Sequence, residues 1–291
     1  MLTGSLQLAA ADIGPGFVAA LAAILGLLIG SFLNVVIYRV PKMMERQWAE
    51  ECAELNGAPA PSAEKFNLLT PRSRCSSCGH SIRWYENIPL LSYVFLRGKC
   101  SACGAPYGLR YPLIEAVTGA LFFFCAWRWG WTMTALAWCG FSAVLLALAV
   151  IDWDTTLLPD DMTLPLLWGG LIAAALQWNP AVDLPSALWG AVAGYLSLWG
   201  VYWAFKLATG KDGMGYGDFK LFAALGAWFG WPALVPMILM ASVIGATVGI
   251  AMKFSSGLRE GGYVPFGPFL AGAGFTAMIF GPQSILQFVG L

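Results

Sequence analysis

Long runs of apolar residues recur along most of this chain, with short polar segments between them. A membrane-spanning α-helix needs roughly 20 consecutive and mainly apolar residues. Eight runs approach or reach this length, at residues 15–38, 112–128, 132–151, 163–178, 187–208, 218–230, 232–253 and 265–281. The sequence therefore predicts an all-α integral membrane protein with about eight transmembrane helices, surrounded by membrane lipid.

The composition agrees with this prediction. Hydrophobic residues make up 58% of the chain and charged residues only 11%, whereas roughly a quarter of the residues in soluble domains are charged. The net charge is zero, so no basic excess points to a nucleic-acid partner. The composition thus disfavours both an ordinary soluble domain and a nucleic-acid-binding protein.

The positive charges predict how the chain is oriented. Ten of the 16 Lys and Arg residues lie between Arg39 and Arg110, and cytoplasmic segments of membrane proteins carry an excess of such residues. With an external N-terminus and eight crossings, every Lys and Arg except Arg128 lies on the cytoplasmic side or at a cytoplasmic helix end. A run at 218–230 that did not cross would move Lys253 and Arg259 outside, so the charges favour eight spans. We expect a first transmembrane helix in 1–38, a cytoplasmic loop in 39–111 and a seven-helix membrane domain in 112–291.

Four of the seven cysteines form two CxxC pairs in the predicted loop. The pairs are Cys75 with Cys78, followed by Gly79, and Cys100 with Cys103, followed by Gly104. This spacing is typical of zinc ribbons, in which four thiolates bind one Zn²⁺ and a glycine permits the tight turn after each pair. Four thiolates leave no open coordination position, so we expect the zinc to be structural. Two disulfides are the alternative, but a cytosolic loop lies in a reducing compartment.

The chain has few residues for catalysis by a histidine base. His80 is the only histidine, which disfavours Ser-His and Cys-His mechanisms and a His-rich catalytic metal site. Carboxylates at the ends of apolar runs are more conspicuous. Asp152 follows the run that ends at residue 151, and Asp218 follows the glycine-rich segment 213–217. Ionisable residues at such positions are costly and indicate function.

The two aspartates differ in what their positions indicate. Asp152 would close a long helix, where the helix dipole disfavours a carboxylate, so a merely structural role is unexpected. Asp218 would open a helix after a glycine-rich turn, where a role as N-cap is an equally good explanation. Two carboxylates that share one proton are the machinery of aspartic proteolysis. We therefore expect Asp152 and Asp218 to be the catalytic residues of an aspartic endopeptidase.

Several blocks along nearly the whole chain resemble the type IV prepilin peptidase family, the bifunctional leader peptidases and N-methyltransferases of bacterial pilus and type II secretion systems. The blocks are GSFLNV from Gly30 with Arg39, the two CxxC pairs, ENIP from Glu86, RYPLIE from Arg110, Asp152 with the LPD from Leu158, GYGDFK from Gly215 and PFGP from Pro265. The resemblance places the two catalytic aspartates of this Gly-x-Gly-Asp type of protease on Asp152 and Asp218.

The resemblance implies that the chain cleaves basic leader peptides from type IV prepilins and type II secretion pseudopilins at the cytoplasmic face of the bacterial inner membrane. It also implies N-methylation of the new N-terminal residue, usually Phe, with S-adenosylmethionine as methyl donor. The Gly-Lys-Cys stretch of the family falls on Gly98 and Lys99, which would then belong to a methyl-donor region in the loop 39–111. A turn glycine and a solvated lysine explain these two residues equally well.

A proton-coupled transporter or channel is the alternative from another functional class, with the two aspartates as proton relays. Such a protein is expected to carry ionisable residues in several spans. Here the charges concentrate at the cytoplasmic ends, and little besides Glu115 and Asn34 lies inside the spans. This distribution favours the peptidase.

Overall fold

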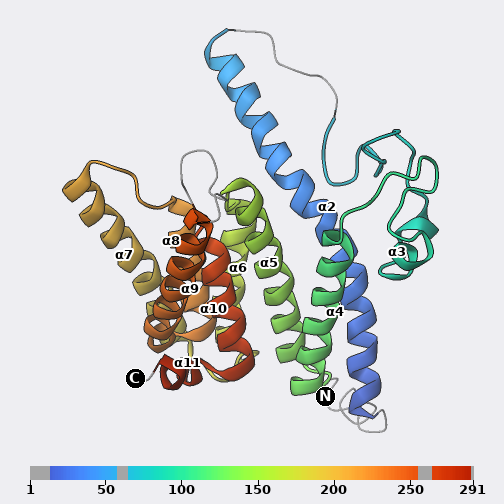
Figure 1. The fold of residues 1–291 in the computed structure, drawn as a ribbon. Helices are drawn as coiled ribbons and strands as arrows, with labels where there is room; N and C mark the ends of the chain where they lie inside the picture. Colours follow the sequence, from blue (N-terminus) through green and yellow to red (C-terminus); the bar gives the residue numbers. More distant parts are fainter. Residues whose placement is uncertain (1–13, 58–64, 255–263, 290–291) are drawn as a thin grey trace. The chain divides into compact units, whose positions relative to one another are not determined.

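The computed structural model describes residues 14–57, 65–254 and 264–289, and in these ranges it contains helices and two isolated β-bridges but no β-strand. The chain forms two compact units, Met1–Ala143 and Val144–Leu291, whose boundary falls inside helix α5. Unit 1 contains α2 (Pro15–Leu55), η1 (Trp84–Asn87), α3 (Leu91–Phe95), α4 (Arg110–Trp129) and the start of α5 (Met133–Thr155) (Figure 1). Unit 2 contains the end of α5, α6 (Asp160–Ala175), α7 (Leu184–Thr209), α8 (Tyr216–Phe229), η2 (Trp231–Ala233), α9 (Leu234–Phe254), α10 (Gly267–Phe280) and α11 (Pro282–Val289).

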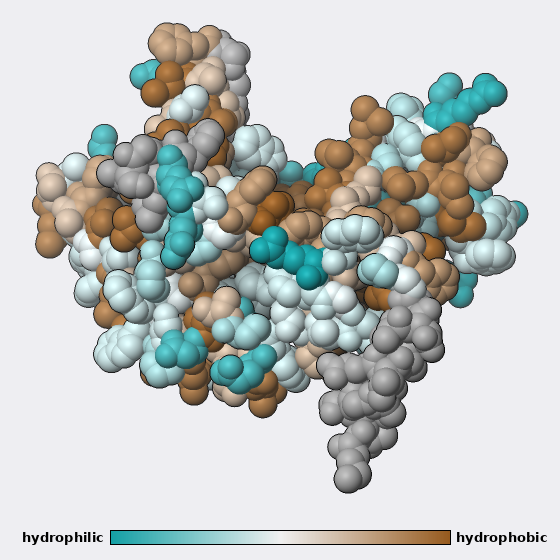
Figure 2. Space-filling view, turned by 90° about the horizontal axis from the view of Figure 1, so that it is seen from below, coloured by the Kyte–Doolittle hydropathy of each residue, from teal (hydrophilic) through white to brown (hydrophobic). Residues whose placement is uncertain are grey.

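The predicted all-helical membrane architecture is confirmed. Each of the eight apolar runs lies largely on a helix, and three helical segments, Pro15–Leu55, Met133–Thr155 and Trp231–Phe254, are long and apolar enough to cross a bilayer. Strongly hydrophilic side chains are sparse on the face seen in Figure 2. Large apolar side chains are exposed instead, for example Trp189 and Phe280, as expected where lipid replaces water. The number of eight crossings stays a prediction.

Helix α2 continues beyond the predicted first span. It has 41 residues and ends at Leu55, whereas the apolar run ends near residue 38. The additional segment contains good helix formers such as Met, Glu, Gln and Ala. Hydropathy reports only the apolar length of a helix, so the polar extension was not visible in the apolar pattern.

Glycines bring α2 and α4 together in unit 1. A Cβ atom on Gly26 would lie 2.8 Å from Phe122 Cβ, and one on Gly30 would lie 2.7 Å from Glu115 Cα. Gly26 and Gly30 are four residues apart and so face the same side of α2, in the small-xxx-small pattern that lets membrane helices approach closely. The close pairing of these two helices positions the segment between them, which carries the four cysteines (Figure 1).

Helix α8 is the buried helix of unit 2. It contacts α6, α7, α9 and α10, and every residue from Asp218 to Phe229 except Lys220 is buried. Gly226 contacts Gly190 of α7 backbone to backbone. A helix that is apolar on all sides is expected inside a helical assembly, and α8 carries Asp218 at its start.

Candidate active site and metal centre

Both predicted catalytic aspartates are buried in unit 2. Asp152 lies near the C-terminal end of α5 and is 4% exposed, and Asp218 lies in the first turn of α8 and is 7% exposed. The N-cap of α8 is Gly215, and no side chain caps this helix. Asp218 is therefore not an N-cap, and the structural explanation that its position in the sequence allowed is wrong.

The structure places the two aspartates in the same part of unit 2, where Leu158 contacts both Gly217, the residue before Asp218, and Gly267, the residue beside Asp152. Asp152 Oδ2 and Asp218 Oδ1 are both buried, and in the described part of the chain Asp218 Oδ1 has no hydrogen-bond partner. A buried carboxylate oxygen without a partner costs free energy, and buried ionisable groups of this kind are typical of functional sites. A role of the two aspartates as a catalytic pair that shares a proton stays a prediction.

The surroundings of Asp152 come from α10 and from the segment after α5. A Cβ atom on Gly267, the first residue of α10, would lie 2.5 Å from Asp152 Oδ2 and 3.3 Å from Leu158 Cδ1. A Cβ atom on Gly217 would likewise lie 2.6 Å from Leu158 Cβ. Leu158 thus packs between the glycine before Asp218 and the glycine beside Asp152. The PFGP block was visible in the sequence, but nothing there assigned Gly267 a place beside Asp152.

Lys220 does not pair with Asp218, the predicted catalytic residue closest to it in sequence. Its Nζ lies 2.7 Å from both Oδ1 and Oδ2 of Asp160, in the first turn of α6. This ion pair joins the starts of α6 and α8 beside the aspartate pair.

The four predicted zinc ligands form one cluster in unit 1. The Sγ atoms of Cys75, Cys78, Cys100 and Cys103 all lie within 4.8 Å of one another. The Sγ atoms of Cys75 and Cys103 are 3.9 Å apart, and those of Cys78 and Cys100 are 4.0 Å apart. A tetrahedral Zn²⁺ with Zn–S bonds of about 2.3 Å separates its sulfurs by about 3.8 Å, whereas a disulfide needs about 2.0 Å. The cluster therefore fits the ion, and all four thiols are free.

The two cysteine turns have the same backbone geometry. Gly79 and Gly104 have φ of 73° and 71°, and their N–H groups donate to the carbonyls of Cys75 and Cys100. The prediction that glycine permits these turns is confirmed. Backbone N–H groups of Cys103 and Ala102 lower the pKa of Cys100 to about 6, which favours the thiolate that a metal binds.

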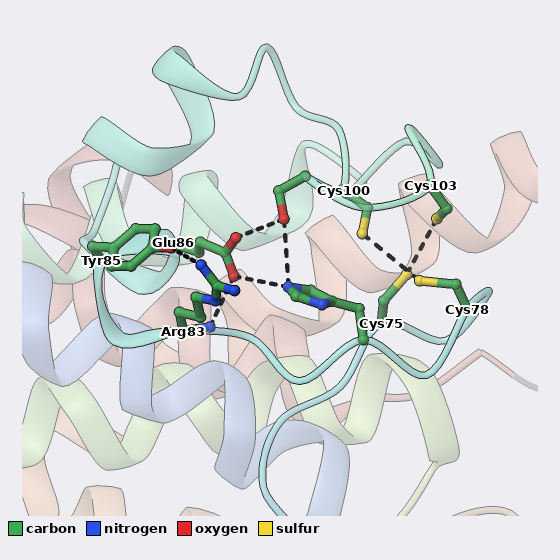
Figure 3. Close-up of polar contacts among 9 residues, drawn as sticks. Cys75, Cys78, Arg83, Tyr85, Glu86, Cys100 and Cys103 are labelled. Atoms are coloured by element: carbon green, nitrogen blue, oxygen red, sulfur yellow. Dashed lines mark hydrogen bonds and ion pairs between the residues drawn. The ribbon is translucent and has the colours of Figure 1, made fainter.

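Glu86 connects the two cysteine turns (Figure 3). Its carboxylate accepts hydrogen bonds from the Arg83 backbone N–H at 2.8 Å and from the Ser101 hydroxyl at 2.6 Å, and it lies 3.3 Å from His80 Nε2. The Arg83 N–H and then the Ser101 hydroxyl are the main causes that lower the pKa of Glu86 to about 2. The sequence offered Glu86 only as part of the ENIP block, and the contact partners are up to 15 residues away.

Gly98 and Lys99 lie next to this cluster. Gly98 has φ of 66°, and its N–H donates to the carbonyl of Tyr93 in α3. A Cβ atom on Gly98 would lie 2.8 Å from the Tyr93 ring. Lys99 is exposed and forms a β-bridge with Pro106. The geometry thus gives Gly98 a clear packing role, and a role of either residue in binding the methyl donor stays a prediction.

The two polar residues expected inside the spans have partners within unit 1. Glu115 is buried and accepts a hydrogen bond from the Leu90 N–H at 2.9 Å. Asn34 Nδ2 donates to the carbonyls of Gly30 and Tyr111, each at 3.2 Å. Both side chains bind backbone groups, as structural polar residues in membrane helices do.

Two family models match the chain. One is described as Bacterial Peptidase A24 N-terminal domain and matches residues 24–129, and the other is described as Type IV leader peptidase family and matches residues 139–250. The first range contains the four clustered cysteines, and the second contains both buried aspartates.

Relatives extend the match over almost the whole chain. A prepilin leader peptidase/N-methyltransferase of Pseudomonas putida is 50% identical over 95% of this chain and 96% of its own length. Proteins of the same name are 52% identical in Stutzerimonas stutzeri, over 93% of this chain and 94% of the relative, and in Pseudomonas aeruginosa, over 92% and 93%. The chain belongs to the type IV leader peptidase family. No solved structure matches it with statistical significance. Gly267, which lies against Asp152, falls outside the residues that the two family models match.

Proposed function

We propose that the chain cleaves basic leader peptides from type IV prepilins and type II secretion pseudopilins as an aspartic protease, and then N-methylates the new N-terminal residue, usually Phe. The observation that carries the first activity is the burial of both Asp152 and Asp218 in unit 2, where Leu158 packs between the glycines beside them. Both activities are supported by the name of the relatives, prepilin leader peptidase/N-methyltransferase.

The aspartate pair supplies the groups that peptide hydrolysis needs. One carboxylate takes a proton from a water molecule, whose oxygen attacks the scissile carbonyl, while the other donates a proton to the carbonyl oxygen. When the tetrahedral intermediate collapses, the C–N bond breaks and the leaving nitrogen receives a proton from the pair. The burial of both side chains strengthens their electrostatic effect on the reacting atoms.

The active site is proposed to face the cytoplasm of a bacterium, from the inner membrane. This orientation rests on the positive charges, since ten of the 16 Lys and Arg residues lie between Arg39 and Arg110. Eight crossings are part of this proposal, with α8 as the short crossing. The buried, all-round apolar character of α8 supports a place inside the helical assembly.

The four-cysteine cluster is proposed to bind one structural Zn²⁺. Its sulfur separations of 3.9 and 4.0 Å support tetrahedral coordination. The surrounding loop is proposed to serve methylation, with S-adenosylmethionine as donor and with Gly98 and Lys99 in the donor region. Cleavage and methylation would then use different parts of the chain.

Two assays on purified protein in detergent test whether cleavage and methylation use different parts of the chain. A prepilin-like substrate with an intact leader reports cleavage, and a synthetic peptide that begins with the mature Phe reports methylation. We expect Asp152→Asn and Asp218→Asn each to reduce cleavage by about 10²- to 10⁴-fold, and to leave methylation of the synthetic peptide unchanged.

Asp161→Asn is the matched control, because Asp161 is an exposed aspartate in the first turn of α6. It should cleave like the wild type. Cleavage that persists in either Asp152→Asn or Asp218→Asn would contradict the aspartic mechanism.

A further inference from the structure

The cysteine-bearing part of unit 1 contains a pocket of about 640 Å³. It lies between η1, α3 and the second cysteine turn, and its lining includes Glu86, Ser101, Leu91 and Phe95. Pockets that bind small molecules have volumes of roughly 300–1,000 Å³, and they combine apolar walls with a few fixed polar groups. This pocket has both properties.

One end of the pocket is polar and held in place. Glu86 lines it with a side chain that is only 8% exposed, fixed by hydrogen bonds from the Arg83 N–H and the Ser101 hydroxyl. Arg83 also lines the pocket, and its side chain is drawn with that of Glu86 in Figure 3. The Arg83 group donates through Nη1 to the Tyr85 hydroxyl, and a guanidinium has five N–H donors, so further donors remain for an anion. An acidic and a basic residue thus line the same pocket.

Apolar side chains also line the pocket. Leu91 and Phe95 of α3 line it and are 56% and 81% exposed. Apolar side chains that gather around polar groups on an exposed surface are typical of ligand-binding grooves. An aromatic ring among them also offers a face on which a planar base can stack.

We propose that this pocket binds the methyl donor S-adenosylmethionine, with its amino-acid end at Glu86 and Arg83 and its adenosine against Leu91 and Phe95. The proposal rests on the proposed methylation. The amino-acid end carries one ammonium and one carboxylate, which complement the Glu86 carboxylate and the Arg83 guanidinium. In the transfer, the uncharged N-terminal amine bonds to the methyl carbon, the C–S bond breaks and leaves its electron pair on sulfur, and the methylated ammonium releases a proton to solvent.

The same geometry gives Gly98 a part in the site without contact to the donor. The Gly98 N–H binds the carbonyl of Tyr93, and a side chain at 98 would strike the Tyr93 ring. Tyr93 belongs to α3, the helix that carries Leu91 and Phe95. Gly98 is therefore a positioning residue for the apolar wall.

The test measures binding of radiolabelled S-adenosylmethionine to the zinc-loaded, full-length protein by equilibrium dialysis. We expect Arg83→Gln and Phe95→Ala each to weaken binding by about tenfold or more, since one charged hydrogen-bonded contact, or one base stacked on an aromatic ring, has about this worth. The matched controls are Arg97→Gln and Val94→Ala, whose side chains are exposed on the same segment and do not line the pocket. They should bind like the wild type.

Zinc content and leader cleavage at wild-type level show that each variant is folded. Wild-type binding of the donor in both pocket variants would contradict the proposal that this pocket binds it. The same holds if Lys99→Gln loses binding while Arg83→Gln and Phe95→Ala keep it. Unchanged donor binding with a raised KM for the acceptor peptide would also overturn it, because the pocket would then hold the mature N-terminus. If the wild type itself neither binds the donor nor methylates, the proposed methyltransferase function fails instead.

Discussion

Gly267 lies directly against the carboxylate of Asp152. A Cβ atom at residue 267 would stand 2.5 Å from Asp152 Oδ2 and 3.1 Å from Asp152 Cγ, and real Cβ atoms essentially never approach another atom to less than 3.0 Å. Any larger residue at the start of α10 would therefore displace the carboxylate or the helix. The observed position of the Asp152 carboxylate therefore requires glycine at residue 267.

We accordingly expect Gly267→Ala to reduce leader cleavage by about 10²-fold, because a displacement of about 1 Å of a catalytic group has an effect of this size. The rate is measured with a prepilin-like substrate at saturating concentration. Methylation of the synthetic mature peptide should remain, since the cysteine-bearing loop is not changed.

Gly272→Ala is the control on the same helix, because a Cβ atom at residue 272 would meet no atom of the described residues within 4 Å. It should leave cleavage unchanged. Full cleavage activity in Gly267→Ala would show that the close contact with Asp152 does not constrain the site.

The sequence predicted those features that depend on local pattern. The apolar runs anticipated the helices because lipid requires about 20 apolar residues per crossing. The spacing of Cys75, Cys78, Cys100 and Cys103 anticipated a cluster because each CxxC pair fixes two ligands on one tight turn. The geometry of Gly79 and Gly104 followed from the same argument and agrees with the structure.

Contacts between distant residues were beyond the reach of the sequence pattern. Gly267 follows Asp152 by more than a hundred residues, and Lys220 is 60 residues from its partner Asp160. Nothing in local spacing selects one such pair among many. The N-cap explanation for Asp218 failed for a related reason, since the exact start of a helix depends on its packing.

The close contact of α7 and α8 predicts opposite effects for two glycine substitutions. The backbones of Gly190 and Gly226 touch, so Gly226→Ala would force the helices apart. We expect it to destabilise the protein by about 1–3 kcal/mol, as overpacking does. Gly200→Ala, on the α7 surface with open space around it, should instead be neutral or stabilise the protein by up to about 1 kcal/mol. Thermal unfolding in detergent measures both, and equal stability of the two variants would contradict the contact.

The geometry of the four-cysteine cluster predicts that the folded structure of the loop around it depends on a bound metal ion. Cys75→Ser removes one of four thiolates, and we expect the bound zinc to fall from about one ion per chain to a small fraction of this value. Removal of zinc from the wild type with a chelator should make the loop equally sensitive to limited proteolysis. Cys52→Ser is the control, because Cys52 is exposed and lies outside the cluster. Full zinc content in Cys75→Ser would show that this thiol is not a ligand.

The hydrogen bonds of Arg39 indicate how the cysteine-bearing loop is attached to α2. Its buried guanidinium donates to the carbonyls of Asn67 at 2.7 Å and Pro71 at 2.5 Å. Lysine keeps the charge but lacks the planar fork that reaches two acceptors, so Arg39→Lys leaves one carbonyl without its donor. Since a charged hydrogen bond contributes about 1.5–3 kcal/mol, we expect local stability to fall by about 2 kcal/mol, seen as faster amide hydrogen exchange around residues 66–71. Arg46→Lys changes an exposed arginine that stacks over the Phe66 ring, whereas the carbonyls of Asn67 and Pro71 accept from Arg39, and it should leave this exchange unchanged. Equal exchange in both variants would mean that Arg39 does not anchor the loop.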